Sequence, residues 1–306
     1  MKKLTLIFTV LAFVLGITII SCTKQATQTD PVITTAADAV VLDNTVADLG
    51  GLLDDYTAAN PTIFVDPTLK AASADPLPTA ALAVDKCAKA TSVKTPVKNA
   101  NNEVTGATIV FTIDFGTTGC VGADGKARRG TIVSTYTWSK LGGWTRLSTV
   151  DMYQSDVHYV GYLTSTYGVT GANNHAYLTE AAALVVTEKD GTTKRSFNSN
   201  RQRELVEGNS PTALVKIWKI TGSSGYTNAA GEKSTYAITN PLYRSTACKS
   251  GFVAGTIVTV TAGVTTTIEY GAFTTYADIK CKEGFTVTKP GANGGPAVTT
   301  FIKFAK

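Results

Sequence analysis

The chain has 306 residues and a formal net charge of +5 at pH 7, which falls to +3 without Lys2 and Lys3. A charge this small gives no basic footprint of nucleic-acid binding. The length suits one large or two small domains. The chain holds 27 glycines but only two methionines and two histidines. With its many threonines, this composition favours strands and turns over helices.

The first residues have the parts of an export signal. Met1-Lys2-Lys3 is positively charged, and the 17 residues from Leu4 to Ile20 are mostly apolar. This order is typical of a secretory signal. The run ends in Ile19-Ile20-Ser21-Cys22, which resembles the lipobox of bacterial lipoproteins. We therefore expect a lipoprotein signal peptide over residues 1–21 and a fatty-acyl anchor, such as palmitate, on Cys22.

Two other interpretations of this segment are an uncleaved membrane anchor and a plain secretory signal. The apolar run is shorter than the roughly 18 residues of a usual membrane span, and it contains Thr5, Thr9 and Thr18. A plain signal ends in a small-x-small site, which Ile19 interrupts. The lipoprotein interpretation places the protein at the bacterial outer membrane or cell surface, facing the periplasm or the exterior. Residues 22–35 would be a flexible tether.

Residues 36–78 are expected to form a short helix followed by a linker. Leu42, Val46, Leu49 and Leu53 follow a 3.6-residue spacing, which predicts a helix from about residue 36 to 56 with one apolar face. Gly50-Gly51 would weaken its middle by roughly 1 kcal/mol per glycine. Its aspartates suggest a solvated face, with a calcium site as the weaker alternative. They are Asp38, Asp43, Asp48, Asp54 and Asp55.

The region from residue 79 to 306 is expected to be antiparallel β structure. Ile109, Phe111 and Ile113 alternate with polar residues, which is typical of a half-buried strand. Asp190-Gly191 and Ala262-Gly263 predict tight turns, and connections this short make neighbouring strands antiparallel. Strands are predicted over residues 107–115, 131–138, 181–188, 193–205, 213–220, 234–239, 256–261, 264–270, 285–288 and 298–304.

One pattern occurs twice in the β region. Thr112-Ile113-Asp114-Phe115-Gly116 precedes Cys120, and Thr267-Ile268-Glu269-Tyr270-Gly271 precedes Cys281. In each half another cysteine, Cys87 or Cys248, lies 33 positions before the first. The shared motif and spacing indicate a duplicated unit, and an even number of cysteines in an exported protein indicates disulfides. We predict the pairs Cys87–Cys120 and Cys248–Cys281. A four-cysteine zinc site would need close pairs such as C-x-x-C, which the sequence lacks.

These motifs also carry a family resemblance. The stretch from Ile113 through Cys120 to Asp124-Gly125-Lys126-Ala127-Arg128-Arg129-Gly130 resembles a signature of β-rich lipoproteins of Bacteroidetes-type bacteria, which have no assigned activity. Ile220-Thr221-Gly222, Pro241-Leu242 and the second cysteine unit resemble the other half of those proteins. The likeness covers roughly residues 85–305 and departs at residues 272–280, where the segment before Cys281 is longer. It implies export, a lipid anchor and a β-rich fold, and no catalytic residue.

Candidates for catalytic chemistry are few. A Ser-His-Asp arrangement would need His158 or His175, and neither lies beside a G-x-S-x-G elbow. Asp114 and Glu269 could form a glycosidase pair, but their equivalent repeat positions favour a role at the strand ends. We predict no catalytic residue, no metal and no cofactor. A basic stretch with Lys194, Arg195, Arg201 and Arg203 is read as a solvated face, or less favourably as a contact for an anionic surface polymer.

The aromatic residues offer one candidate binding surface. Trp138 and Trp144 flank a predicted hairpin turn, and Tyr153, Tyr159, Tyr162 and Tyr167 follow. Exposed rings could stack on sugar faces, whereas packed rings would belong to the core.

The sequence thus predicts an all-β fold, an antiparallel sandwich or a strongly curved sheet with an internal duplication, after a short helix and a tether. The expected function is a non-enzymatic binding or scaffolding role at the envelope, with a glycan or an envelope protein as partner. A glycan-binding lipoprotein for carbohydrate uptake is the alternative, and an envelope hydrolase is a weaker one.

Overall fold

The computed structural model describes residues 31–58, 75–76, 87–122, 125–139, 143–170, 175–208, 215–248 and 251–304. A compact unit runs from Val32 to Lys306, and the fold described below is that of this unit. The predicted signal peptide, Cys22 and most of the predicted linker lie outside the described residues.

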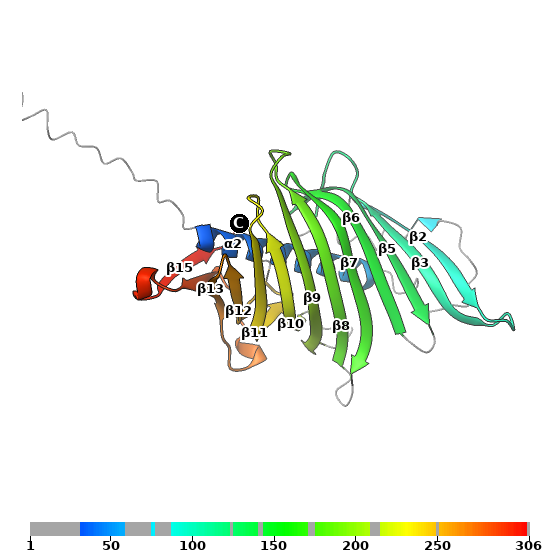
Figure 1. Ribbon diagram of the computed structural model, residues 1–306. Coiled ribbons are helices and arrows are strands. Elements are labelled where there is room, and N and C mark those ends of the chain that lie inside the picture. Colours follow the sequence, from blue (N-terminus) through cyan, green and yellow to red (C-terminus); the bar gives the residue numbers. More distant parts are fainter. Residues whose placement is uncertain are drawn as a thin grey trace, which may run out of the picture. The chain divides into compact units, whose positions relative to one another are not determined.

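The described part of this unit consists of one long helix and one antiparallel sheet, with two short 3-10 helices (Figure 1). The elements are α2 (Pro31–Ala58), β1 (Asp75–Pro76), β2 (Lys89–Lys98), β3 (Val104–Asp114), β4 (Cys120–Val121), β5 (Ala127–Ser139), β6 (Gly143–Gln154), β7 (Val157–Thr170), β8 (His175–Thr187), β9 (Lys194–Glu207), β10 (Ile217–Thr227), β11 (Lys233–Ser245), β12 (Ala254–Thr261), β13 (Val264–Gly271), η2 (Tyr276–Asp278), β14 (Gly284–Lys289), η3 (Ala292–Gly294) and β15 (Val298–Lys303).

The strands follow one another across the sheet in chain order from β1 to β15, except that the two-residue β4 only pairs with β5. The predicted all-β, antiparallel class is confirmed. Of the two predicted arrangements, the described strands form a single sheet rather than a sandwich. The tight turns at Asp190-Gly191 and Ala262-Gly263 join β8 to β9 and β12 to β13, as predicted. The strand predicted over residues 213–220 is displaced, since β10 begins at Ile217 and continues to Thr227.

The two faces of the sheet differ in burial. In β3, Ile109, Phe111 and Ile113 are buried, whereas Val110 and Asp114 are exposed. The ring of Phe111 meets the ring of Tyr56 from α2 at 6.3 Å between centroids. We call the side that α2 covers the helix face and the opposite side the outer face. The core therefore lies between α2 and the helix face (Figure 1).

Helix α2 is longer than predicted and is not interrupted at its two adjacent glycines. It begins at Pro31, within the segment expected to be a tether, and continues through Gly50-Gly51. A Cβ at Gly51 would lie 3.3 Å from Nη1 of Arg244. The two glycines, which weaken a helix, therefore lie where α2 passes close to side chains of the sheet. Within the described residues, no helix is both long and apolar enough to cross a membrane.

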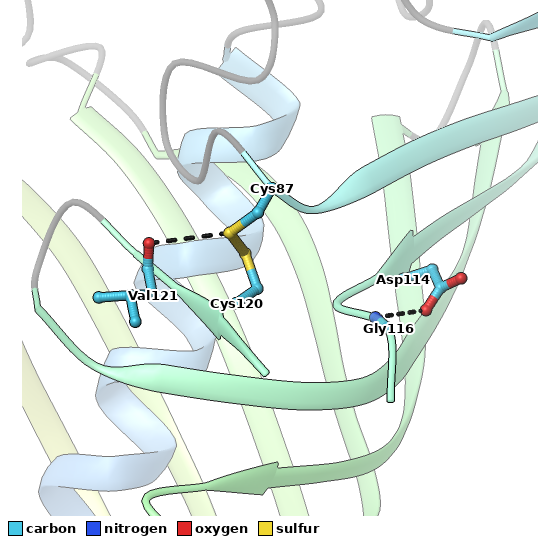
Figure 2. Close-up of a disulfide and its surroundings, with 5 residues drawn as sticks. All are labelled: Cys87, Asp114, Gly116, Cys120 and Val121. Atoms are coloured by element: carbon cyan, nitrogen blue, oxygen red, sulfur yellow. Dashed lines mark hydrogen bonds between the residues drawn. A yellow bond between two sulfur atoms is a disulfide. The ribbon is translucent and has the colours of Figure 1, made fainter. Parts of the chain in front are cut away.

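The two disulfides are those predicted from the repeat. Cys87–Cys120 and Cys248–Cys281 have Cα–Cα distances of 5.5 and 5.2 Å. The first closes the β2–β3 hairpin, as Figure 2 shows, and the second closes the β12–β13 hairpin. Both units therefore have the same order, which is a cysteine, a hairpin and a second cysteine.

The repeated Thr-Ile-acid-aromatic-Gly motif ends one strand in each unit. Gly116 and Gly271 have φ values of 73° and 95°, a conformation that side chains with a Cβ disfavour. Oδ1 of Asp114 accepts a hydrogen bond of 2.8 Å from the backbone N–H of Gly116 (Figure 2). This contact agrees with the strand-end role predicted for Asp114.

Candidate functional site

A line of ion pairs joins α2 to the helix face of the sheet. Four of the five aspartates that were expected to face solvent instead meet arginines and one lysine, so that prediction was wrong for them; the side chain of Asp55 lies outside the described part. The pairs are Asp38 with Arg195, Asp43 with Arg201, Asp48 with Lys126 and Arg244, and Asp54 with Arg146 and Arg203. The basic stretch of β9 was misassigned to a solvated face in part, because Arg201 and Arg203 are each only 5% exposed, whereas Lys194 is exposed as expected. Buried side chains such as these can stay charged because each is paired with an opposite charge.

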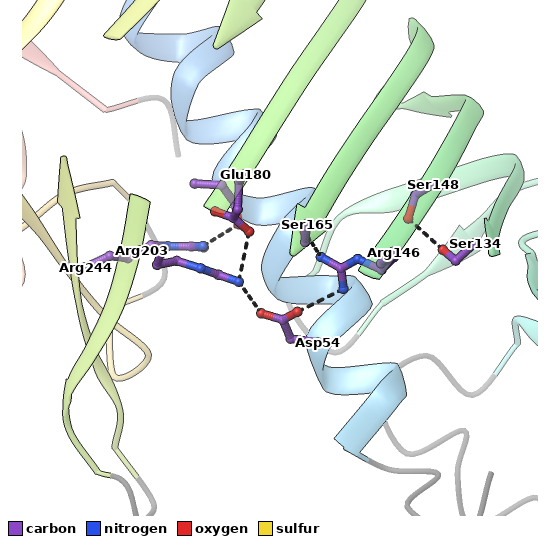
Figure 3. Close-up of polar contacts among 9 residues, drawn as sticks. Asp54, Ser134, Arg146, Ser148, Ser165, Glu180, Arg203 and Arg244 are labelled. Atoms are coloured by element: carbon purple, nitrogen blue, oxygen red, sulfur yellow. Dashed lines mark hydrogen bonds and ion pairs between the residues drawn. The ribbon is translucent and has the colours of Figure 1, made fainter. Parts of the chain in front are cut away.

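The densest part of this interface surrounds Asp54 (Figure 3). Nη1 of Arg146 donates to Oδ1 of Asp54 at 2.9 Å, and Nη2 of Arg203 donates to Oδ2 at 2.5 Å. Nη2 of Arg203 also lies 3.1 Å from Oε1 of Glu180, and Nη2 of Arg146 donates to Ser165 at 2.9 Å. Burial raises the pKa of Asp54, but the two arginines outweigh it and hold the pKa below its usual value.

A second buried pair behaves differently because it has only one arginine. Asp43 is fully buried and contacts Nη2 of Arg201, which also donates to Ser224 at 2.8 Å. Burial is the larger effect here, so the pKa of Asp43 is raised despite the attraction of Arg201. Burial and the nearby carboxylate of Asp43 likewise raise the pKa of Tyr236 well above its usual value.

A small cavity lies beside these pairs, under the middle of α2. Its volume is about 30 Å³, and its lining includes Gly50, Glu180, Arg203 and Trp218. That is room for a water molecule, but far below the roughly 300 Å³ or more of a small-molecule pocket. Asp54 and Glu180 do converge on Arg203, yet no sugar ring fits between them. This arrangement positions the helix rather than a substrate.

A different cluster of functional side chains lies on the outer face. Arg129, Tyr153 and His158 occupy paired positions on β5, β6 and β7. The guanidinium of Arg129 lies 4.1 Å from the ring centroid of Tyr153, and Tyr153 stacks on His158 at 4.1 Å with 3° between the planes. Nε2 of His158 is 2.8 Å from Oδ1 of Asp151. We call Arg129, Tyr153 and His158 the stacked cluster.

Charged residues from two hairpin tips border the stacked cluster. Asp156 lies 3.9 Å from Arg129 and 3.0 Å from Lys189 of the β8–β9 turn. Together with Lys194, these residues line an open depression of about 570 Å³. Lys194 is exposed and has no ion pair among the described residues. The lining of the depression thus includes an ammonium group without an ion pair, a guanidinium and an imidazole, as well as the carboxylates of Asp156 and Glu188. The unneutralised ammonium group suits an anionic group of a ligand.

The predicted stacking residues Trp138 and Trp144 do not lie on this exposed surface. They are directly paired near the ends of β5 and β6, in positions that alternate with the outer face. Trp144 packs against the core, and its ring lies 5.8 Å from that of Tyr136. Of the four tyrosines named with them, Tyr159 is buried and Tyr162 is 47% exposed. The row of co-planar exposed rings that would favour sugar stacking is not formed by these two tryptophans.

The other candidates of the sequence are separated in space. Asp114 and Glu269 are both exposed, and eight strands lie between β3 and β13 in the sheet order. Nε2 of His158 is hydrogen-bonded to Asp151, while His175 begins β8 far along the strand from the depression. No group of three or more His, Cys, Asp or Glu residues within the described segments could hold a metal ion.

No family model, no curated protein and no solved structure matches the chain.

Sequence reasoning missed the buried charges and the stacked cluster. The sequence did contain a signal for the buried charges. Arg201 and Arg203 lie an even number of positions from the apolar residues Phe197 and Leu205 of the same strand. Side chains in phase along a strand share one face, so these arginines had to be buried if Phe197 was. The stacked cluster had no such signal, since its residues meet only through the register of three strands.

Proposed function

We propose that this protein is a lipid-anchored bacterial envelope protein that works by binding, with the depression beside the stacked cluster as its binding surface. The observation that carries the binding role is that the ammonium group of Lys194, which has no ion pair among the described residues, lines the same open depression as Arg129 and His158. The lipid anchor rests on the lipobox-like sequence that ends in Cys22.

A binding role is favoured over hydrolysis by the way the carboxylates are engaged. Asp54 and Glu180 are committed to Arg203, and Asp43 is committed to Arg201. A general acid or base needs a proton-transfer partner within reach of substrate, and the cavity beside these groups is too small for one. The exposed depression has the size of a ligand site, and its chemistry is that of anion recognition.

The ligand class that fits is an acidic glycan or another envelope component with carboxylate or sulfate groups. Both faces of the Tyr153 ring are covered, by Arg129 on one side and His158 on the other. A neutral sugar therefore finds no free ring there to stack on. Arg129 and Lys189, in contrast, can exchange their contacts with Asp156 for contacts with an incoming anion.

The lipid anchor is tested by labelling cells with a fatty acid analogue. Wild-type protein should carry the label and a Cys22→Ala variant should not. An unlabelled wild-type protein with an unmodified Cys22 would refute the anchor while leaving the binding surface untested by that result, so binding is measured separately.

Binding is tested with the full-length protein in detergent micelles on an array that includes uronic-acid and sulfated glycans beside neutral ones. We expect retention on acidic glycans, which Lys194→Ala and Arg129→Ala weaken. Lys233→Ala is the control, because Lys233 is an exposed lysine on β11, away from the depression. Retention only on neutral glycans, or equal losses for the control, would contradict the proposed surface.

A further inference from the structure

The two edges of the sheet are protected very differently. The β2 edge carries Pro96 and three lysines within its strand, and the short strand β1 pairs with part of it. Proline, lysine and a covering segment are devices that keep sheet edges from pairing with other chains. The β15 edge has the sequence Val-Thr-Thr-Phe-Ile-Lys, with no proline and a single lysine at its end. Among the described residues, no strand pairs with its far side.

Strand β15 is nevertheless firmly held. All six of its residues pair with β14. The ring of Phe304, which follows the strand, lies 5.7 Å from that of Phe285 and stacks at 6.5 Å on Tyr270. The ring of Phe301 lies over Gly284, where an added Cβ would come within 2.8 Å of it. The edge is therefore an ordered template rather than a frayed end.

The pairing of β15 with β14 determines which backbone N–H and C=O groups of this edge are free. The N–H of Phe304 donates to the carbonyl of Glu283 at 2.8 Å. Because residues of an antiparallel strand alternate between bonding to one neighbour and to the other, Ile302 and Thr300 also bond to β14. The N–H and C=O groups of Thr299, Phe301 and Lys303 then point away from the sheet.

We propose that β15 pairs antiparallel with β15 of a second copy of this chain, about a two-fold axis through Phe301. In this register Phe301 lies opposite Phe301 of the partner subunit, and Thr299 lies opposite Lys303 of the partner subunit. Every free N–H and C=O of one edge meets its counterpart on the other. The two sheets become one continuous sheet whose outer faces lie on the same side.

The choice of a second copy rests on self-complementarity. A two-fold contact requires each patch to match itself. The three outward residues of this edge are centred on Phe301, so the edge matches a second copy that runs in the opposite direction. No like charges meet, because the only lysine of the strand faces a threonine. The exposed Phe301, which is 54% accessible, gains an aromatic neighbour across the axis.

The dimer is tested by sedimentation of the full-length protein in density-matched detergent micelles. The wild type should sediment with two copies per particle. Thr299→Pro removes one outward N–H without touching a backbone hydrogen bond to β14, although it removes the hydroxyl contact with Thr288. It should weaken the dimer about tenfold or more, since two edge hydrogen bonds are lost. Thr299→Val is the matched control, because it loses the same hydroxyl and keeps the N–H. It should remain dimeric.

The register is tested by disulfide trapping in cell envelopes. In a directly opposed, hydrogen-bonded pair the Cα atoms lie about 5.5 Å apart, within the range that a disulfide spans. Phe301→Cys should therefore cross-link to itself, and Thr300→Cys, which lies opposite Ile302 of the partner subunit, should not. A monomeric wild type with no Phe301→Cys cross-link would overturn the proposal. Dimers that Thr299→Pro leaves intact would overturn it as well, because another surface or partner strand would then hold them.

Discussion

Asp43 of α2 and Arg201 of β9 form an ion pair in which the side chains are 0% and 5% exposed. Such a pair is costly to bury and is even more costly to break, because the partner left behind is an isolated charge. The pair fixes one position of α2 along β9, since no other described aspartate contacts Arg201. It therefore specifies where the helix lies as well as holding it there.

Replacing Asp43 with alanine should lower the free energy of unfolding by about 3–5 kcal/mol, because Arg201 would be left buried without a counter-charge. The double variant Asp43→Leu, Arg201→Met should lose much less, since both charges are removed together. Urea unfolding followed by circular dichroism measures both values.

The matched control is Asp38→Ala. Asp38 and Arg195 form the same kind of contact at 3.3 Å, but their side chains are 27% and 24% exposed. Screening by water limits such a pair to about 0–1 kcal/mol. Equal losses for Asp43→Ala and Asp38→Ala would mean that burial does not set the strength of the helix attachment.

Asp54 and Asp43 should give the stability of the fold opposite dependences on pH. The pKa of Asp54 is below its usual value of 3.8, so its pairing stabilises the fold above pH 3.8 and is lost as the pH falls through the lower folded pKa. The pKa of Asp43 is raised, so ionisation of Asp43 costs stability at neutral pH, and that cost disappears as the pH falls toward 3.8.

The measurement is urea unfolding from pH 7 to pH 3 for the wild type, Asp54→Asn and Asp43→Asn. The advantage of the wild type over Asp54→Asn should shrink below pH 3.8. Its advantage over Asp43→Asn should grow as the pH falls from 7 toward 3.8. The same trend for both variants would contradict the assignment of opposite pKa shifts.

Local sequence patterns predicted several features of the fold correctly. Alternation in residues 107–115 predicted β3 and its buried face, because a period of two has one physical meaning in a half-buried strand. Equal cysteine spacing predicted both disulfides. Each of these features is set within a few dozen residues, where sequence and geometry are tightly linked.

Contacts between distant segments could not be read in the same way. Asp54 and Arg203 are 149 positions apart, and they meet only because α2 lies in one particular position across the helix face of the sheet. The aspartate spacing that suggested a solvated face is equally compatible with a basic sheet beneath the helix. Tyr153 and His158 likewise stack through the β6–β7 register, which the sequence leaves open.

Removing either disulfide should cost about 3–4 kcal/mol on the chain-entropy model, because each closes a loop of 33 positions. Cys87→Ala with Cys120→Ala removes the first link, and Cys248→Ala with Cys281→Ala removes the second. Equal loop lengths predict similar losses in guanidinium unfolding, and added reductant should bring the wild type below either variant. A loss confined to one pair would show that native contacts, rather than loop closure, determine the effect.

Gly161, at the centre of β7, should be far more sensitive to a side chain than a turn glycine. Its φ is 154°, and an added Cβ would lie 2.0 Å from the carbonyl oxygen of Ala183 in β8. Backbone cannot move aside as a flexible side chain can, so Gly161→Ala should cost about 3 kcal/mol or more or prevent folding.

Gly191 provides the comparison for Gly161. It also has a positive φ, 72°, but nothing lies within 4 Å of an added Cβ, so Gly191→Ala should cost only about 1 kcal/mol for the unfavourable backbone conformation. Thermal unfolding of the two variants separates steric contact from backbone strain. If Gly161→Ala is no worse than Gly191→Ala, β7 and β8 cannot pair in the register that brings Gly161 against Leu184. His158 could then not lie opposite Thr187 in the candidate site either, because the Gly161–Leu184 and His158–Thr187 pairs belong to the same β7–β8 register.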